Sequence, residues 1–371
     1  MAGIYVHIPF CKSRCIYCGF FSTTSLNERG RYVDALCDEL LRRKDFLRGE
    51  AVETIYFGGG TPSQLAVADV EKVLQHIYNI YNVYGEAEIT LEGNPDDLSP
   101  DYLKALHAMG INRLSMGVQT FSDIRLKFLN RRHSSMQAIS AVENAQRAGF
   151  ANISIDLMFG FPSQTMDEWE QDVRQALSLG VQHLSAYSLM YEEGTKLGHM
   201  LDAGEVEEID DELSLLMYEH LIDATASAGF EHYEISNFAL PGMHSRHNSS
   251  YWHGIPYLGV GAGAHSYDGK DRCFNSNSLN DYLRGSSPVF EHLTERERYD
   301  EFVFTGLRTS SGINISDLEH LFGTPYKDYC LKNSARHIVS GSLLHTGDVL
   351  RLSRKGMFIS NDIMSDLMWV E

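Results

Sequence analysis

The chain has 371 residues, a length that corresponds to about two domains, or to one large barrel with an appended module. It carries 50 acidic against 31 basic side chains, and this net charge of −19 excludes general nucleic-acid binding through a basic surface. The sequence contains no apolar run of about 18 residues, so no membrane span is expected. Its first residues lack the basic and apolar regions of a signal peptide, and we therefore expect a cytoplasmic protein.

From residue 3 to residue 236, short apolar runs alternate with amphipathic segments of helical period. The predicted strands are Ile4–Ile8, Thr54–Phe57, Glu88–Glu92, Arg113–Gly117, Asn152–Leu157 and His183–Ser188. The predicted helices between them include Tyr32–Leu47, Val67–Tyr78, Asp101–Met109, Met136–Ala148 and Met166–Leu179. This repeated alternation predicts a parallel sheet with crossover helices. Periodicity fits an open doubly wound sheet and a partial (β/α) barrel equally well.

The remainder of the chain follows a different pattern. Residues 237–290 are rich in Asn, Ser, Gly, His and aromatic residues, and we interpret them as a connecting segment with a functional role. Residues 291–371 contain predicted helices at Glu295–Thr309 and Ile315–Phe322, and a predicted hairpin at Ser342–Ser353. This combination indicates a small winged-helix-like domain. Its 12 acidic and 9 basic side chains do not favour DNA binding. The expected parts are thus 1–236, 237–290 and 291–371.

Three of the six cysteines, Cys11, Cys15 and Cys18, lie within eight residues directly after the first predicted strand. Soft thiolates at this density bind zinc or an iron–sulfur cluster. A structural zinc site normally uses two ligand pairs, whereas three thiolates can hold a [4Fe–4S] cluster and leave one iron open. A zinc-stabilised turn with His7 as the fourth ligand remains an alternative. The other cysteines are predicted to be buried in the core: Cys37, Cys273 and Cys330.

The C-x3-C-x2-C run after the first strand of a β/α protein resembles the radical S-adenosylmethionine (SAM) superfamily. More narrowly, the sequence resembles the oxygen-independent coproporphyrinogen III oxidase family over nearly its whole length. The motifs that carry this resemblance are Tyr5-Val-His7-Ile-Pro9-Phe-Cys11, Phe57-Gly58-Gly59-Gly60-Thr61-Pro62, Glu92-Gly-Asn94-Pro95, Ser115-Met-Gly117-Val-Gln119, Leu129-Asn130-Arg131, Ile155-Asp156-Leu157, Gly160-Phe-Pro162, Glu193-Gly194-Thr195 and His247-Asn248-Ser-Ser-Tyr251-Trp252. The resemblance implies an α/β fold, a partial (β/α)6 TIM-like radical-SAM barrel with a small C-terminal winged-helix-like α+β domain.

The resemblance also implies roles for individual residues. Cys11, Cys15 and Cys18 would hold the [4Fe–4S] cluster, and SAM would chelate its open iron. The residues expected to contact SAM or to flank the cluster are Tyr5, Tyr17, Gly60, Thr61, Glu92, Gln119, Arg131 and Asp156. Structural alternatives are a turn for the glycines and for Glu92, and aromatic packing for the tyrosines. Arg132 and His133 are expected to be solvated neighbours of Arg131.

Two branches of the family differ in function. The oxidases decarboxylate porphyrinogen propionates with a SAM-derived radical, whereas HemW-type members are haem chaperones. In this chain Phe20 stands where the oxidases have a fourth cysteine, and ten residues precede Cys11 where the oxidases carry an extension. The H-N-x-x-Y-W motif at His247–Trp252 is that of the HemW type. His247 could ligate haem iron, and Tyr251 could pack against the porphyrin. A rigid loop in which His247 caps backbone groups is the alternative.

We therefore expect a haem chaperone that binds a [4Fe–4S] cluster, SAM and haem, and that passes haem to acceptor proteins of respiration. The alternative is a radical-SAM enzyme acting on a tetrapyrrole, such as the oxidase, so catalytic activity is left open. A zinc-stabilised barrel without redox chemistry is a third possibility. The expected partners are haem, haem-acceptor proteins and an electron donor; peripheral membrane association and a homodimer are also left open.

Overall fold

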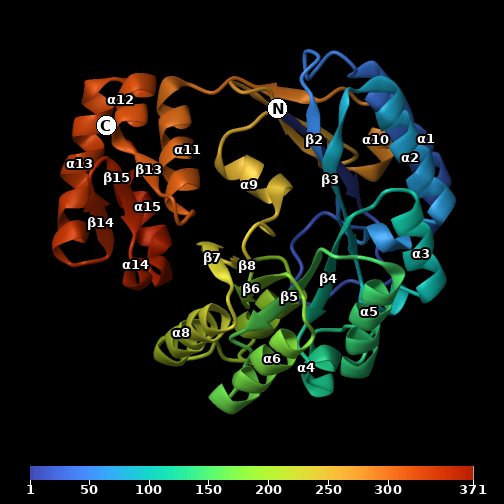
Figure 1. Cartoon of the computed structure of the whole chain (residues 1–371), viewed down its shortest axis with the longest axis horizontal. Coiled ribbons are helices and arrows are strands. Elements are labelled where there is room, and N and C mark those ends of the chain that lie inside the picture. Colours follow the sequence, from blue (N-terminus) through green and yellow to red (C-terminus); the bar gives the residue numbers. More distant parts are fainter. Residues whose placement is uncertain (371) are drawn as a thin grey trace.

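The structure, a computed structural model, describes residues 1–370. Its main body is a 12-stranded sheet in the order β12-β11-β10-β9-β1-β2-β3-β4-β5-β6-β8-β7 (Figure 1). The central strands follow the chain order and pair in parallel: β1 (Ala2–Ile8), β2 (Val52–Gly59), β3 (Val83–Gly93), β4 (Arg113–Gln119), β5 (Ile153–Phe159) and β6 (His183–Ser188). Within the described residues β1 pairs on its outer side with β9, and β6 with β8, so the sheet does not close. The predicted partial barrel is confirmed.

Helices cover the outer face of these strands (Figure 1). They are α1 (Arg29–Arg42), α2 (Val67–Ile80), α3 (Pro100–Ala108), α4 (Asp123–Phe128), α5 (Ser135–Ala148), α6 (Met166–Ser178) and α8 (Asp211–Ser227), with a 3-10 turn, η1 (Leu26–Glu28), before α1. Helix α7 (Lys196–Asp202) lies instead beyond the strand ends, where Leu197 packs with Ile16. In α2 the buried residues Val70, Val73, Leu74 and Ile77 recur at the helical period, and this is the stripe that packs on the sheet. The amphipathic pattern therefore locates these helices correctly.

Helix α1 ends at Arg42, earlier than the predicted Leu47. Arg43 to Leu47 form turns, from which the Arg43 guanidinium donates to the Gly259 carbonyl oxygen at 2.9 Å. Phe46 and Leu47 still pack against the core from these turns. The apolar period therefore continues past the end of the helix, and this is why the predicted helix is too long.

The segment 237–290 contributes secondary structure to the main sheet. Its elements are β8 (Asn237–Ala239), α9 (Arg246–Trp252), β9 (Tyr257–Val260), β10 (His265–Tyr267), β11 (Arg272–Phe274), α10 (Leu279–Leu283) and β12 (Val289–Glu291). Strand β8 pairs with the edge strand β7 (Glu231–Glu234), which precedes the segment. Strand β9 lies parallel to β1, and β10 to β12 continue antiparallel. Strands of three or four residues are too short to show a period in the sequence.

The C-terminal domain lies to one side of the sheet and has its own core (Figure 1). Its elements are α11 (Glu295–Leu307), β13 (Ile313–Asn314), α12 (Ile315–Phe322), α13 (Thr324–Val339), β14 (Leu343–Thr346), β15 (Val349–Leu352), α14 (Arg354–Phe358) and α15 (Ser360–Leu367). The predicted hairpin is β14–β15. Helix α13 was not predicted, because its buried residues, Cys330 and Ser334, do not form an apolar stripe.

The sequence also predicted three buried cysteines and no membrane-spanning helix. Cys37, Cys273 and Cys330 are buried, as predicted for core residues. Within residues 1–370, no helix combines the length and the apolar character that crossing a bilayer requires.

Candidate functional site: the cysteine loop and the strand ends

The predicted site residues converge at the carboxyl ends of the central strands. The cysteine loop follows β1, the glycine run ends β2, Glu92 lies near the end of β3, and Gln119 ends β4. The register places His7 beside Gly58 and Asp156 beside Gly117. Loops that follow parallel strands meet at one face of a barrel, and such faces build active sites.

The cysteine loop is held at several points by the rest of the barrel. The Cys11 amide donates to the Thr23 carbonyl at 2.9 Å, and the Ile16 amide donates to the Leu129 carbonyl at 3.3 Å. The Ile16 side chain is buried in a small cluster that includes Leu129 and Phe161. Between these anchors Cys11, Cys15 and Cys18 are free thiols that remain partly exposed. The loop thus fixes its backbone while it presents three soft ligands.

The surroundings of the thiols combine burial with hydrogen-bond donors. Burial raises the pKa of the Cys11 and Cys18 thiols, so the neutral forms are favoured in the metal-free protein. The Thr61 hydroxyl lies 3.3 Å from Cys11 Sγ, and an Arg131 guanidinium nitrogen lies 3.5 Å from Cys15 Sγ. Both groups can stabilise a thiolate once iron has displaced its proton. Three thiols with such neighbours fit a [4Fe–4S] cluster.

His7 does not join this donor set. Its Nδ1 lies 3.0 Å from the Tyr5 hydroxyl and its Nε2 lies 3.2 Å from the Phe21 carbonyl oxygen. Burial lowers the pKa of His7 to about 4. Among residues 1–370, no three His, Cys, Asp or Glu side chains are arranged to hold a single metal ion. The zinc-stabilised turn therefore lacks its expected fourth ligand.

The glycine run at the end of β2 allows close approach to β1. Gly59 has φ of 108°, and a Cβ built there would lie 2.5 Å from the His7 ring. A Cβ on Gly60 would lie 2.8 Å from the backbone of Pro9, and the Gly60 amide donates to the Ile8 carbonyl at 2.8 Å. Glycine is required at these positions by packing against the end of β1 and against Pro9, which follows it. Thr61 follows with its hydroxyl at the Cys11 thiol.

Two carboxyl groups, Glu92 and Asp156, lie within the barrel below the cysteine loop. Glu92 accepts a hydrogen bond from the Tyr56 hydroxyl at 2.6 Å, and Asp156 lies 3.5 Å from the Ser115 hydroxyl. Burial raises the pKa of Glu92 to about 7, with a smaller contribution from the negative charge of Asp156. Burial likewise raises the pKa of Asp156 to about 6. Buried carboxyls without a salt-bridge partner are typical of ligand sites.

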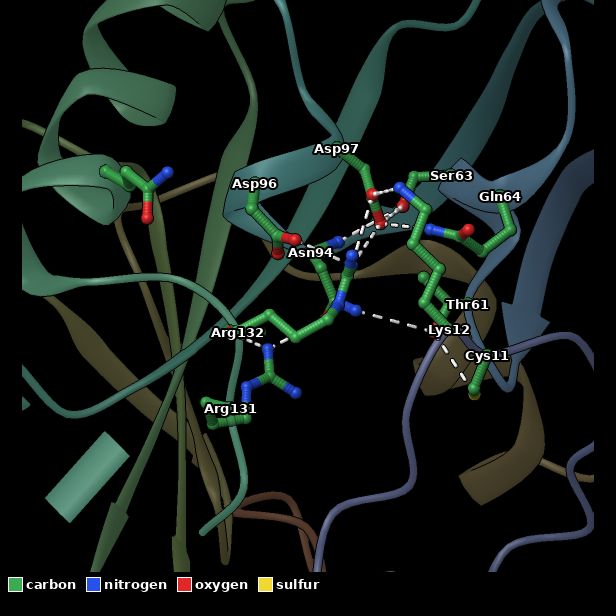
Figure 2. A network of polar contacts seen from close by, with 12 residues as sticks. Cys11, Lys12, Thr61, Ser63, Gln64, Asn94, Asp96, Asp97, Arg131 and Arg132 are labelled. Atoms are coloured by element: carbon green, nitrogen blue, oxygen red, sulfur yellow. Dashed lines mark hydrogen bonds and ion pairs between the residues drawn. The ribbon is translucent and has the colours of Figure 1, made fainter. Parts of the chain in front are cut away.

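Arg131 reaches the same space from the loop after α4. It donates to Asn94 Oδ1 at 2.7 Å (Figure 2). It also donates to the Gly117 carbonyl oxygen and approaches Cys15. Its Nε is buried and has no hydrogen-bond partner within the described residues. An unsatisfied guanidinium nitrogen next to the cysteine loop can bind a carboxylate.

Backbone strain marks two neighbours of Arg131. Gln119 has φ of 70° and Asn130 has φ of 63°, both in the left-handed region that non-glycine residues rarely adopt. Gln119 is buried, and its amide nitrogen would lie 2.9 Å from a Cβ on Gly117. Strain of this kind concentrates at functional sites. Of the two tyrosines predicted to flank the cluster, Tyr17 lies beside Cys15 and Arg131. The ring of Tyr5 stacks on that of Tyr56, with 6.2 Å between the ring centres.

The sequence did not predict the ion-pair network that holds the cysteine loop. The Asp97 carboxylate is 3% exposed and lies in a short turn, η3 (Pro95–Asp97), after β3. It accepts hydrogen bonds from Lys12 at 2.9 Å, from Ser63 at 3.2 Å and from Gln64 in the turn η2 (Pro62–Gln64) (Figure 2). Lys12 belongs to the cysteine loop, so Asp97 ties that loop to the ends of β2 and β3.

His133 is not solvated, contrary to expectation, whereas Arg132 is exposed as expected but forms ion pairs. The Arg132 guanidinium pairs with Asp96 at 2.7 Å and with Asp97 at 3.1 Å. His133 is buried, and its Nε2 lies 3.1 Å from the Val118 carbonyl oxygen. The carboxylates of Asp96 and Asp97 are thus the acceptors of this network.

Comparison with known proteins identifies the family. The radical SAM superfamily matches residues 5–176, and the HemN C-terminal domain matches residues 293–359. The chain is 33% identical over 368 residues to the heme chaperone HemW of Lactococcus lactis, covering 98% of this chain and 96% of that protein. The chain belongs to the HemW family of radical SAM proteins. It is also 34% identical over 375 residues to HemW of Bacillus subtilis, with 98% of each chain covered.

A solved structure shows the same fold as this HemW-family chain. Coproporphyrinogen III oxidase (HemN) from Escherichia coli, a radical SAM enzyme, is 23% identical and matches with a TM-score of 0.85. The match covers 99% of this chain and 90% of that one. The likeness therefore extends through both the barrel and the C-terminal domain, and it concerns the fold.

The H-N-x-x-Y-W motif of this HemW-family chain forms helix α9 near the amino ends of β1 and β2. His247 is 1% exposed; its Nδ1 lies 2.8 Å from the Thr54 hydroxyl and its Nε2 lies 2.8 Å from the Tyr251 hydroxyl. Burial lowers the pKa of His247 to about 3. Both ring nitrogens of His247 face side-chain hydroxyl groups, and neither caps a backbone group as the alternative expected. The expected axial role of His247 stays a prediction.

Proposed function

We propose that this protein is a haem chaperone, which binds haem and passes it to acceptor proteins of respiration in the cytoplasm. The observation that carries the proposal is 33% identity, over 98% of this chain, to a protein named as a heme chaperone. The match spans the barrel, the α9 motif and the C-terminal domain together. Phe20, at the position of the oxidases' fourth cysteine, is 71% exposed beside the loop and offers no further thiol.

We further propose that the cysteine loop carries a [4Fe–4S] cluster and that SAM binds beside it. Cys11, Cys15 and Cys18 would supply the thiolates. When bound and reduced, the cluster supplies the electron that cleaves a carbon–sulfur bond of SAM. Around it, Arg131 offers its unsatisfied Nε to a carboxylate, while Glu92 can bind ribose hydroxyls or an ammonium group. An electron donor is a required partner in this proposal.

The cofactor part is tested by anaerobic reconstitution with iron and sulfide. The expected content is about four irons and four acid-labile sulfides per chain, with broad absorption near 400 nm. A Cys37→Ser variant, which changes a buried core thiol, should retain this content, whereas Cys15→Ser should lose it. Stoichiometric zinc without labile sulfide would contradict the proposal.

The chaperone part is tested by three parallel assays on the reconstituted protein. Haem titration should give saturable binding, and mixing with apomyoglobin should transfer the bound haem. Anaerobic incubation with coproporphyrinogen III and SAM should yield no decarboxylated product. Product at catalytic rates would instead establish the alternative, a radical-SAM enzyme acting on a tetrapyrrole.

A further inference from the structure

A cavity separate from the site at the strand ends lies between the connecting segment and the C-terminal domain. Its volume is about 1350 Å³, and its walls come from α9, the strands β9 to β11, α11 and α12. Pockets for drug-sized ligands measure about 300–1,000 Å³, so this space can take a macrocycle larger than such ligands. Neither the cluster nor the SAM residues line it.

The walls of the cavity carry flat aromatic rings from both sides. Those from the connecting segment and the C-terminal domain are Tyr251, Trp252, Tyr257, Tyr267, Phe302, Phe304 and Phe322. Trp252 is fixed from across the domain boundary, because the Arg308 guanidinium lies 4.9 Å from its ring centre. Rings of this kind pack well against a planar apolar ligand.

His253 supplies a metal-binding nitrogen in the same cavity. It follows α9 directly, is exposed and lines the space. Its Nδ1 lies 2.7 Å from the Ser249 carbonyl oxygen. Because a carbonyl oxygen can only accept, Nδ1 carries the proton and the neutral ring presents the Nε2 lone pair. A carbonyl oxygen that accepts from one ring nitrogen in this way orients the other nitrogen toward a metal.

The charges of the cavity suit a ligand with two carboxylates. Lys270 and Arg298 line it and form no ion pair within the described residues. Arg272 is instead neutralised by Glu301 at 2.8 Å. The other acids in the wall are Asp300, which accepts a hydrogen bond from the Trp369 amide at 2.7 Å, and Asp317 in the first turn of α12. The two unpaired cations are thus available to the ligand.

The register of the sheet fixes where this cavity lies relative to the cysteine loop. Tyr257 pairs with Gly3 at the start of β1, whereas Cys11 follows Ile8 at the other end. At about 3.3 Å per residue, the strand from Gly3 to Ile8 is roughly 16 Å long. The two sites therefore lie at opposite ends of the barrel.

We propose that haem binds in this cavity, with His253 Nε2 as an axial ligand of the iron and the two propionates at Lys270 and Arg298. This inference rests on the proposed chaperone function and assigns its cargo site. The haem is then held away from the SAM site, where a SAM-derived radical does not reach it, and the cargo leaves the protein chemically unchanged.

The test is haem titration of the full reconstituted chain and of single variants, followed by absorption and resonance Raman spectra. His253→Ala should weaken binding by about 10-fold or more and shift the Soret band, and added imidazole should restore the spectrum. Lys270→Glu with Arg298→Glu should weaken binding of haem without a Soret shift, and should leave binding of haem dimethyl ester unchanged. His199→Ala, on the exposed face of α7, is the matched control.

The possible failures are distinguishable. If the wild type binds haem and His253→Ala keeps the wild-type affinity and spectrum, the assigned ligand is wrong. If the double charge reversal binds haem and its ester as the wild type does, the assigned cavity is wrong. If the wild type binds no haem at all, the proposed function itself is refuted. Cluster absorption near 400 nm, measured before titration, reports whether each variant is folded.

Discussion

Glu92 shows how a single buried carboxyl sets a pH dependence. Its pKa in the folded protein is raised to about 7 by burial, above the value in the unfolded chain. The folded state therefore binds more protons than the unfolded state between these two pKa values. Stability attributable to Glu92 is fully present at low pH and is lost as the pH rises through about 7.

We predict that Glu92→Gln flattens this dependence. In cluster-free protein, the wild type should lose about 2 kcal/mol of unfolding free energy relative to the variant between pH 5 and pH 8. Urea unfolding at both pH values measures the difference. Because the charges of Glu92 and Asp156 act on each other, the difference between the two proteins reports the coupled pair. Parallel profiles for the two proteins would show that Glu92 has an ordinary pKa.

The role of Asp97 in holding the cysteine loop could not be predicted from the sequence. An acid two residues after a proline is an ordinary turn signal, and only the fold brings Lys12, Ser63 and Arg132 to it. By contrast, it was predictable that Cys11, Cys15, Cys18 and Arg131 meet at the strand ends, because their spacing and order along the chain follow a known family; their roles as ligands stay predictions. Contacts between distant loops carry no such local signature.

We predict that Asp97→Asn loosens the cysteine loop. Its charge-assisted bonds to Lys12 and Arg132 would be lost, at a cost of about 1–3 kcal/mol in the free energy of unfolding. The cluster should also be removed faster by a chelator, which the decay of absorption near 400 nm measures. Asp101→Asn, an exposed acid in the first turn of α3, is the control. Equal decay rates in all three proteins would contradict the role assigned to Asp97.

At the scale of elements, the strands β1 to β6 were predictable because each is an apolar run bounded by turn residues. The segment 237–290 was not, since its strands are short and gain stability only by extending an existing sheet. Helix α8 was missed for another reason: its apolar residues are spread around the helix, and Leu216 is 55% exposed. The period of apolar residues predicts helices and strands that bury one face. It does not predict elements that form only because they pair with other parts of the fold.

Helix α9 depends on a carboxylate from the neighbouring strand. The Arg246 and His247 amides at its start donate to Glu88 at 3.1 and 3.0 Å, where a negative charge favours the helix dipole. We predict that Glu88→Gln destabilises the protein by about 1 kcal/mol, measured by urea unfolding. Glu86→Gln, an exposed neighbour on β3, should change nothing. Equal losses in the two variants would refute the cap.

For the whole molecule, the two proposed sites should be separable. A variant with Cys11, Cys15 and Cys18 all changed to Ser should lose the cluster but bind haem with an affinity within about 3-fold of the wild type, because strand β1 lies between the sites. Haem titration of the cluster-free variant measures this. A loss of haem affinity by 10-fold or more would place the haem at the cysteine loop instead.

The burial of the cysteines divides them into two classes of chemical reactivity. Cys37, Cys273 and Cys330 are at most 6% exposed, whereas the three loop thiols are partly open to solvent. A mild alkylating reagent should therefore modify about three thiols per chain in cluster-free protein and almost none where iron occupies them. Mass spectrometry of the alkylated protein would then separate chains that carry iron from chains that do not, and would give the fraction of each in a preparation. The same openness makes these thiols the first groups that oxygen damages when the iron is lost.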